Sequence, residues 1–451
     1  MYKLYLCIFL FLLFATGAYS QNTQIEKQLD ELFARQFKAS APGCAVLVAQ
    51  KGVVIYKKAF GSAQLELNVP MQPDMVFKIA SITKQFTAVA ILQLVEQGKI
   101  GLQDSLQKYI PDFPSKGHTI TIEHLLTHTS GIRDYMQIDY RGTNMERWDY
   151  TPKQLIDSFK HYALAFEPGT KYSYSNSGYY LLGYIIEKVS GKPYQLYIQD
   201  NLLKPLGLNH SFFDTDGKII PNRVNGYRQA GAAYVNADFW SPSLAYAAGG
   251  LLANTEDLFH WFRGLLTYKI LKKELLEKAF TPFTLKDGSP LTYGYGWYIL
   301  QTGNIKFIEH SGKMNGFTSN AVYFPEQDVY IAILFNCEDA AKDALSREVS
   351  EIVLGQALQT GTKQSDKTLD TYVGTYNLTT SPNRSIEVFK ENNRLMAKVS
   401  GQQTFEVLFQ SGTKFQLKNI KDLAGEFIVE NGVVTKMLMS QNGQFEWKKT
   451  K

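Results

Sequence analysis

Cysteine is scarce in this chain, and its scarcity excludes a disulfide scaffold. The 451 residues include only three cysteines, Cys7, Cys44 and Cys337. Cys44 and Cys337 lie in apolar, strand-like stretches, CAVLVAQ and YIAILFNC. Buried free thiols are common in such surroundings. We therefore expect two unpaired thiols there, with a bridge between them as the alternative.

Blocks of basic residues are also absent, and this bears on the partners of the protein. The formal net charge of +5 is spread along the chain. Proteins that bind nucleic acid or anionic lipid usually concentrate lysine and arginine on one segment or face. We therefore expect no nucleic-acid partner, and membrane contact only through the N-terminal segment.

The N-terminal apolar segment, Leu4 to Ala15, is too short to cross a bilayer comfortably. It follows Lys3 and precedes the small-residue stretch Ala18-Tyr19-Ser20, which is the layout of a secretory signal. We expect cleavage near Ser20 and a secreted or periplasmic protein. The alternative is an uncleaved signal that anchors the chain.

Beyond this segment, strand-like sequence stands on both sides of a helical middle. AVLVAQKGVVIYKKAFG contains two β-rich runs around Lys51-Gly52, and FTSNAVYFPEQDVYIAILFNC turns between Pro325 and Asp328, so both predict hairpins. Apolar residues recur at helical spacing from Phe86 until Gly98, and GYYLLGYIIEKVSG is helical in pattern. This order predicts an α+β domain whose sheet pairs the two ends of the segment.

A polar stretch that begins at Gly355, GQALQTGTKQSDKT, is typical of a linker. The sequence after it is nearly all β. SIEVFKENNRLMAKV, QTFEVLFQSGTKFQLK and FIVENGVVTKMLM each alternate polar and apolar residues across a turn that contains Asn or Gly. Such regular hairpins predict a small antiparallel barrel or sandwich.

The stretch KIASITKQF, residues 78–86, places Ser81 and Lys84 on one face of a predicted helix. A buried lysine has a lowered pKa and can accept a proton, and a helix N-terminus stabilises negative charge on the serine oxygen. Such a serine can attack a carbonyl. The alternative is a helix-capping serine beside a solvated lysine, and the apolar neighbours Ile79, Ile82 and Phe86 argue against it.

Two downstream elements add groups that such a serine needs. Tyr174-Ser175-Asn176 supplies a phenol that a neighbouring cation could make more acidic, and an amide that could bind a substrate amide. His310-Ser311-Gly312 precedes an apolar hairpin, where glycine lets a substrate lie against the strand edge. The next backbone N–H, of Lys313, could join that of Ser81 in an oxyanion hole. The alternatives are a tyrosine that packs on the core and a turn that enters a strand.

Together the three elements resemble the serine β-lactamase and penicillin-binding-protein superfamily, with its Ser-x-x-Lys, Tyr-x-Asn and third Lys/His-Ser/Thr-Gly motifs. The resemblance is closest to the branch of class C β-lactamases, D-alanyl-D-alanine carboxypeptidases, D-aminopeptidases and related esterases. It covers about Ala41 to Cys337. Further similar stretches are LLTHTSGI, FEPGTKYSYSNSGY, KPLGLNHS, AAGGLLANTEDL and YGYGW.

The resemblance implies an antiparallel sheet flanked by helices, with an all-helical subdomain. It also implies that the C-terminal part, from YVGTY onward, is a lipocalin-like β-barrel of the kind appended to many relatives. The expected boundaries are a signal peptide over residues 1–20, a serine hydrolase domain over 21–357, a linker over 358–368 and the barrel over 369–451. In such relatives the barrel can take part in homo-oligomer formation or shape access to the active site, and a passive appendage is the alternative.

Four catalytic roles follow from the resemblance. Ser81 would be the acylated nucleophile, and Lys84 would tune its proton. Tyr174 would be the base for acylation and would later direct water. His310 would supply a hydrogen bond or positive charge toward the substrate or Tyr174.

Four further residues are implied in substrate binding. Asn176 would hold the substrate amide, and Ser311 and Gly312 would line the strand edge. The N–H groups of Ser81 and Lys313 would form the oxyanion hole. No metal or other cofactor is implied, although His124 and His128 have the spacing of a metal pair.

The implied substrate is a small amide or ester, with short peptides that contain D-amino acids, such as a cell-wall peptide, as the first class. Dedicated class C β-lactamases carry lysine in the third motif, whereas this chain has His310, which is mostly neutral near pH 7. We therefore expect weak β-lactamase activity at most. The alternatives are an esterase, or a binding or sensor protein that kept the fold without turnover.

Overall fold

A computed structural model describes residues 22–137, 145–214, 218–358, 366–391, 394–399, 404–411, 413–417, 424–430, 433–440 and 444–450. The chain divides into two compact units, Met1–Leu300 with Lys306–Gly355, and Gln301–Ile305 with Gln356–Lys451. The predicted signal peptide lies outside the described residues. In the part of the chain that is described, no helix has both the length and the apolar character needed to cross a membrane.

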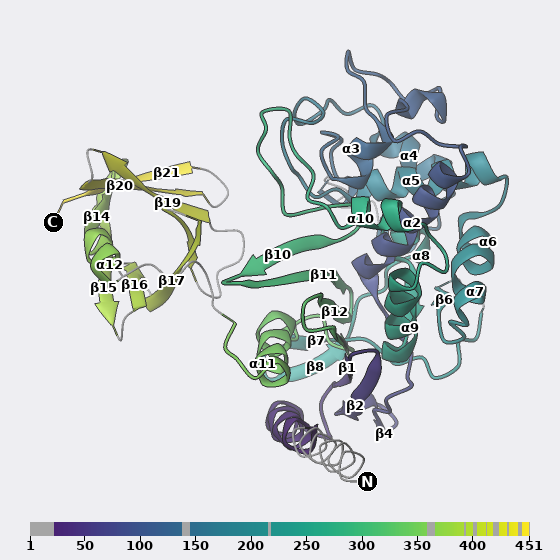
Figure 1. The fold of residues 1–451 in the computed structure, drawn as a ribbon, viewed down its shortest axis with the longest axis horizontal. Coiled ribbons are helices and arrows are strands. Elements are labelled where there is room, and N and C mark those ends of the chain that lie inside the picture. Colours follow the sequence, from purple (N-terminus) through teal and green to yellow (C-terminus); the bar gives the residue numbers. More distant parts are fainter. Residues whose placement is uncertain are drawn as a thin grey trace, which may run out of the picture. The chain divides into compact units, whose positions relative to one another are not determined.

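The first unit is built on a six-stranded sheet of order β10-β11-β12-β13-β1-β2 (Figure 1). Its strands are β1 (Cys44–Gln50), β2 (Val53–Phe60), β10 (Tyr298–Thr302), β11 (Ile305–Met314), β12 (Phe317–Phe324) and β13 (Val329–Phe335). Strands β1 and β13 are antiparallel, from Cys44 opposite Phe335 to Gln50 opposite Val329. The prediction that the two ends of the domain pair is therefore confirmed.

Local turn chemistry sets the two predicted hairpins. Lys51 and Gly52, between β1 and β2, have φ values of +51° and +77°, as a type I′ turn requires. The second hairpin turns between Phe324 and Val329, also as predicted. Cys44 and Cys337 are buried free thiols, so the expected unpaired state is confirmed and the alternative bridge is wrong.

Helices cover both faces of the sheet, and for this reason every residue of β12 and β13 is buried. Helix α9 packs on β1 and β13, and α11 packs on β12 and β13 from the opposite side (Figure 1). Beside the sheet lies a mostly helical region around α2 and α5. The helices of the first unit are 22–36, α2 (Thr83–Glu96), α3 (Ile122–Leu126), α4 (Pro152–Phe159), α5 (Asn176–Ser190), α6 (Tyr194–Ile198), α7 (Lys204–Leu206), α8 (Pro242–Gly249), α9 (Thr255–Leu266), α10 (Lys273–Ala279) and α11 (Lys342–Leu354).

Helix α2 is surrounded by protein, and this matters for the site. Every residue from Thr83 to Leu92 is buried, so the helix has no solvent face over that stretch. A helix buried all round carries any polar side chain into the core. Lys84 is such a side chain. The short strands of the first unit are β3 (Ser62–Gln64), β4 (Val69–Pro70), β5 (Phe77–Lys78), β6 (Phe212–Phe213), β7 (Tyr227–Ala230), β8 (Ala233–Asn236) and β9 (Leu251–Ala253).

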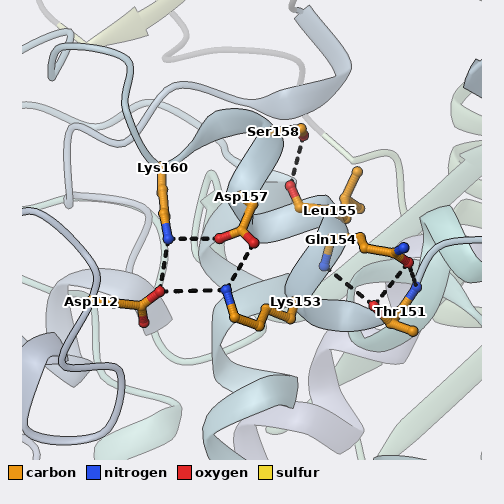
Figure 2. A network of polar contacts seen from close by, with 8 residues as sticks. All are labelled: Asp112, Thr151, Lys153, Gln154, Leu155, Asp157, Ser158 and Lys160. Carbon is orange, nitrogen blue, oxygen red and sulfur yellow. Dashed lines mark hydrogen bonds and ion pairs between the residues drawn. The ribbon is translucent and has the colours of Figure 1, made fainter.

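Helix α4, which packs on α5, is fixed at both ends by polar contacts (Figure 2). The Thr151 side chain accepts the Gln154 N–H (3.3 Å), and the Gln154 side chain accepts the Thr151 N–H (2.9 Å). Such a capping residue contributes about 1 kcal/mol. At the other end, Lys160 forms ion pairs with Asp112 (2.7 Å) and Asp157 (2.6 Å). These contacts fix the position of α4 against α5 in the helical region.

The second unit contains a closed barrel in which neighbouring strands follow chain order. The barrel form of the predicted barrel or sandwich is therefore confirmed. Its strands are β14 (Gly374–Leu378), β15 (Ser381–Glu391), β16 (Arg394–Val399), β17 (Thr404–Ser411), β18 (Lys414–Leu417), β19 (Ala424–Glu430), β20 (Val433–Ser440) and β21 (Gln444–Lys449). Helix α12 (Asp366–Tyr372) precedes them, so the last residues of the predicted linker are helical; residues 359–365 lie outside the described part.

Candidate active site

Ser81 lies in a single turn, η1 (Ala80–Ile82), directly before α2. Strand β5 leads into this turn, and the Ile79 N–H donates to the Leu251 carbonyl (3.1 Å), which ties the turn to β9. Ala80 has a φ of +47°, a strained conformation for a residue other than glycine. Ser81 thus sits at the N-terminus of a long helix, where the backbone dipoles favour negative charge.

A cavity of about 300 Å³ opens beside Ser81. It brings together six predicted residues: Ser81, Tyr174, Asn176, His310, Ser311 and Lys313. Lys84 and Gly312 do not line it, because both are buried behind its wall. The other lining residues are mostly apolar: Ala80, Tyr135, Met136, Trp240, Ala245, Ala248, Gly249, Tyr298 and Met314. Tyr135 and Met136 come from the turn at Tyr135–Gln137 and Trp240 comes from the segment before α8, while residues 138–144 lie outside the described part.

Lys84 is fully buried and makes three polar contacts. Its Nζ lies 3.1 Å from Ser81 Oγ, 2.8 Å from Asn176 Oδ1 and 2.8 Å from the Ala248 carbonyl oxygen. Burial lowers the pKa of Lys84 to about 7, and the nearby Asp134 carboxylate opposes part of this shift. A substantial fraction of Lys84 is therefore neutral at pH 7.

The partners of Lys84 determine where the neutral amine presents its lone pair. Asn176 Oδ1 and the Ala248 carbonyl can only accept hydrogen bonds. The two N–H groups of neutral Lys84 satisfy these two oxygens, and the remaining direction points to Ser81 Oγ. The neutral amine is thus oriented to accept the serine proton.

Asn176 begins α5 and joins Lys84 to Asp134. Its Nδ2 donates to Asp134 Oδ2 (2.9 Å) and to Met136 Sδ (3.2 Å), while its Oδ1 accepts from Lys84. Both amide hydrogens are therefore used within the protein. In the free protein Asn176 therefore positions Lys84, and its expected contact with a substrate amide stays a prediction.

Tyr174 lies beside Lys84, whose Nζ is 4.8 Å from the centre of the tyrosine ring. Burial raises the pKa of Tyr174 well above 10, and a hydrogen bond with Ser81 only partly opposes this. The expectation that Lys84 makes this phenol more acidic is therefore wrong for the free protein. Desolvation and the nearby Asp134 carboxylate both disfavour the phenolate, so Tyr174 keeps its proton and can donate it.

His310 is buried on β11, and both ring nitrogens have partners. Nδ1 lies 2.7 Å from the Ser311 carbonyl oxygen, which can only accept, so Nδ1 carries the proton. Nε2 then accepts from the Tyr293 hydroxyl (3.0 Å). Burial lowers the pKa of His310 to about 3. Of the two expected contributions, a positive charge is therefore wrong for the free protein.

Gly312 also allows a close contact within the protein, and its expected role at the substrate edge stays a prediction. A Cβ at this position would lie 2.3 Å from the Ile79 carbonyl oxygen and 2.4 Å from Ser319 Oγ. The glycine therefore lets β11 lie directly against the turn that carries Ser81. Lys313, the next residue, then lines the same cavity as Ser81, as an oxyanion hole built from the two N–H groups requires.

Sequence reasoning missed His128 and Asp134. His128 accepts the Ser175 N–H at Nδ1 (3.1 Å), and its ring lies 4.2 Å from that of Tyr174 between centres. His124 accepts the Thr121 N–H at Nδ1 (3.2 Å). The two histidines that have the spacing of a metal pair therefore each accept a hydrogen bond from a backbone N–H. The stretch LLTHTSGI was a signal for His128. No sequence motif around Asp134 indicates its role, because that role depends on a hydrogen bond with Asn176 that forms only in the folded protein.

Comparisons with known proteins agree with this geometry. Residues 23–354 match the family model described as Beta-lactamase. The chain is 29% identical to Penicillin-binding protein 4* of Bacillus subtilis (strain 168), over 93% of this chain and 97% of the relative. An octameric penicillin-binding protein homologue from Pyrococcus abyssi has a TM-score of 0.65 and 26% identity, with 94% and 99% of the two chains covered. A D-stereospecific amidohydrolase from Streptomyces sp. has a TM-score of 0.60 and 26% identity, covering 74% and 97%.

Proposed function

Because the chain belongs to the β-lactamase family, we propose that it is a serine hydrolase that cleaves a small amide or ester through an acyl-enzyme on Ser81. One observation carries the proposal. The fully buried Lys84 has a pKa lowered to about 7 and lies 3.1 Å from Ser81 Oγ. A lysine held in this way costs stability, and activation of the serine explains why the fold keeps it.

Acylation begins with proton transfer from Ser81 Oγ to the neutral Nζ of Lys84. Oγ then forms a bond to the substrate carbonyl carbon, whose electron pair moves onto the carbonyl oxygen. The Ser81 and Lys313 N–H groups stabilise this oxyanion. The helix N-terminus at Ser81 favours the same charge.

Collapse of this intermediate expels the leaving amine or alkoxide, which needs a proton. The protonated phenol of Tyr174, which is hydrogen-bonded to Ser81, donates it, and Lys84 returns a proton to Tyr174. Water repeats the sequence on the ester carbonyl and releases Ser81. Neutral His310 holds Tyr293 and the end of β11 in place.

The substrate class is inferred from the walls of the cavity and from one relative. Tyr135, Met136 and Trp240 offer apolar surface for a hydrophobic side chain. The similarity to a D-stereospecific amidohydrolase supports amides and short peptides of D-amino acids as the first class. A neutral His310 provides no fixed charge for a β-lactam carboxylate, which supports weak β-lactamase activity at most.

Mass spectrometry after incubation with a fluorophosphonate or a β-lactam tests the nucleophile. We expect one adduct, on the peptide that contains Ser81, and none on Ser81→Ala. Ser311→Ala is the matched control, because Ser311 lines the same cavity, and it should still label at Ser81. Equal labelling of Ser81→Ala would overturn the assignment.

Turnover distinguishes the enzyme from its alternatives. Rates on D-amino-acid amides, D-Ala-D-Ala peptides, p-nitrophenyl acetate and nitrocefin should be highest for the D-amino-acid substrates. A preference for the acetate ester would favour the esterase. Stable acylation of Ser81 with no turnover on any of these would favour a binding or sensor protein.

A further inference from the structure

A second cavity, of about 400 Å³, adjoins the one at Ser81. Trp240 and Met314 line both cavities. The second cavity therefore begins where the wall of the first ends, beyond the end of β11. A ligand that is longer than the first cavity would reach the second along the two residues that both share, Trp240 and Met314.

The residues that line the second cavity include more cationic than anionic side chains. Asp214 receives two cations: Lys78 Nζ lies 2.8 Å from Oδ2, and an Arg223 guanidinium nitrogen lies 2.9 Å from Oδ1. These three side chains carry one net positive charge. Among the described lining residues, Lys218 adds another positive charge. Asp238, which also lines the cavity, forms an ion pair with Arg228 (3.6 Å).

Two of these groups are held out of water. The side chains of Lys78 and Asp214 are 16% and 8% exposed, whereas that of Arg223 is 37% exposed. Charges that water screens poorly act more strongly on a neighbouring ion. The exposed part of Arg223 is available to a ligand while Asp214 orients the guanidinium.

Backbone contacts fix this cluster relative to Ser81. Lys78 belongs to β5, which runs into the turn of Ser81. The Val76 N–H donates to the Asn222 carbonyl (2.9 Å) and the Val224 N–H to the Val76 carbonyl (3.1 Å), so the segment with Arg223 runs beside β5. The Asp214 N–H donates to the Gly250 carbonyl (3.2 Å), next to β9.

Two glycines fix the wall of the second cavity beside the turn between β11 and β12. A Cβ on Gly226 would lie 3.0 Å from Gly316 Cα, and one on Gly316 would lie 2.7 Å from Gly226 Cα. The pair of glycines thus lets the loop after Arg223 approach the turn between β11 and β12. The cavity is therefore bounded by segments that also build the catalytic site.

We propose that the second cavity is a subsite for a carboxylate of an extended peptide substrate, bound by Arg223 and Lys78 while the scissile carbonyl lies at Ser81. This inference rests on the proposed function and deepens it: the preferred substrates are acidic peptides that extend beyond Trp240. Both terminal nitrogens of Arg223 contact Asp214 (2.9 and 3.3 Å), so a ligand carboxylate would be bound by the N–H groups that remain on the exposed part of the guanidinium.

The test compares two D-amino-acid esters that differ only in an N-terminal succinyl group, which is anionic, or a succinamoyl group, which is neutral. A second pair carries the same difference on the leaving-group side. We expect kcat/KM to be higher for the anionic member of one pair. This preference should fall about fivefold in Arg223→Gln, and it should weaken as salt is raised.

Two controls separate this site from the general charge of the protein. Arg263→Gln removes an arginine that is 34% exposed and paired with Asp328, in neither cavity, so the preference should stay. Arg223→Lys keeps the charge and should retain most of the preference. Equal rates within both pairs, or an undiminished preference in Arg223→Gln, would overturn the subsite.

Binding to Ser81→Ala separates failure of the subsite from failure of the proposed function. The corresponding succinyl and succinamoyl peptide amides are titrated into this variant by calorimetry. Tighter binding of the succinyl form, lost on adding Arg223→Gln, supports the subsite even if Ser81 proves unreactive. Equal binding of the two forms counts against it even if Ser81 is acylated.

Discussion

Lys84 is the residue whose titration should control the reaction. Its pKa is lowered to about 7, whereas that of His310 is lowered to about 3 and that of Tyr174 is raised well above 10. Among these three groups only Lys84 changes its charge between pH 5 and 9. Acylation needs the neutral amine, so kcat/KM for an uncharged ester should rise with pH, with its midpoint near 7.

The measurement is a pH profile of acylation with a substrate that does not titrate. Below the midpoint, the rate should fall about tenfold per pH unit. Lys84→Met should lose roughly a thousandfold or more of the rate. A flat profile from pH 5 to 8 would contradict this role of Lys84.

The sequence predicts the identities of the reactive groups better than their charge states. The spacing of Ser81 and Lys84, the apolar residues around them and the two downstream motifs together predicted a buried lysine. The pKa of Tyr174 was predicted in the wrong direction, because desolvation depends on packing from many segments. Asp134 was missed because it lies far from Lys84 in the sequence and acts on it only in the folded protein, by its charge and through the amide of Asn176.

At the scale of elements, the contact of β11 with the turn of Ser81 aligns the two halves of the site. Gly312→Ala places a methyl group 2.3 Å from the Ile79 carbonyl oxygen, so the strand or the turn must move. We expect acylation to fall at least tenfold, because a shift of this kind separates the two oxyanion N–H groups. Overpacking should also cost about 1–3 kcal/mol of stability.

The matched control for this change is Gly249→Ala. A Cβ on Gly249 would lie 3.6 Å or more from its nearest neighbours, which include Ala80 of the same turn, and this is ordinary contact. Labelling rates of the two variants by a fluorophosphonate, with circular dichroism to confirm folding, provide the comparison. Similar rates for Gly312→Ala and the unmodified protein would contradict the role given to close packing.

Elements whose ends are set by local chemistry were predictable. The hairpin at Lys51-Gly52 and the helix that ends near Gly98 depend on residues that are adjacent in the chain. Strands β5, β6 and β9 have two or three residues each and are held by partners far away in sequence, so no periodicity reveals them. The first three residues of α12, 366–368, were assigned to the linker because of their polar composition.

For the whole molecule, buried Lys84 links stability to pH. Its pKa is about 7 in the folded protein and 10.5 ordinarily, so between these values the unfolded chain binds a proton that the folded protein lacks. The free energy of unfolding therefore rises with pH in this window, by up to about 1.4 kcal/mol per pH unit from this group. Below pH 7 the contribution becomes constant.

Urea unfolding at pH 7.5, 8.5 and 9.5 measures this contribution of Lys84 to the free energy of unfolding. The comparison is between the unmodified protein and Lys84→Met. The unmodified protein should gain stability relative to Lys84→Met as pH rises. Tryptophan fluorescence is a suitable signal, since Trp261 and Trp297 are buried in the first unit. A constant difference across this range would show that Lys84 has an ordinary pKa.

The pairing of β1 with β13 also controls when the protein can become reactive. Ser81 and Lys84 are synthesised early, but Lys313 and the strand that closes the sheet come much later in the chain. Contacts between such distant segments form late in folding, because the intervening chain must first be ordered. A growing chain that ends before Phe335 carries the serine without the geometry that activates it. The topology therefore predicts that the proposed hydrolytic activity appears only when synthesis of the first unit is nearly complete.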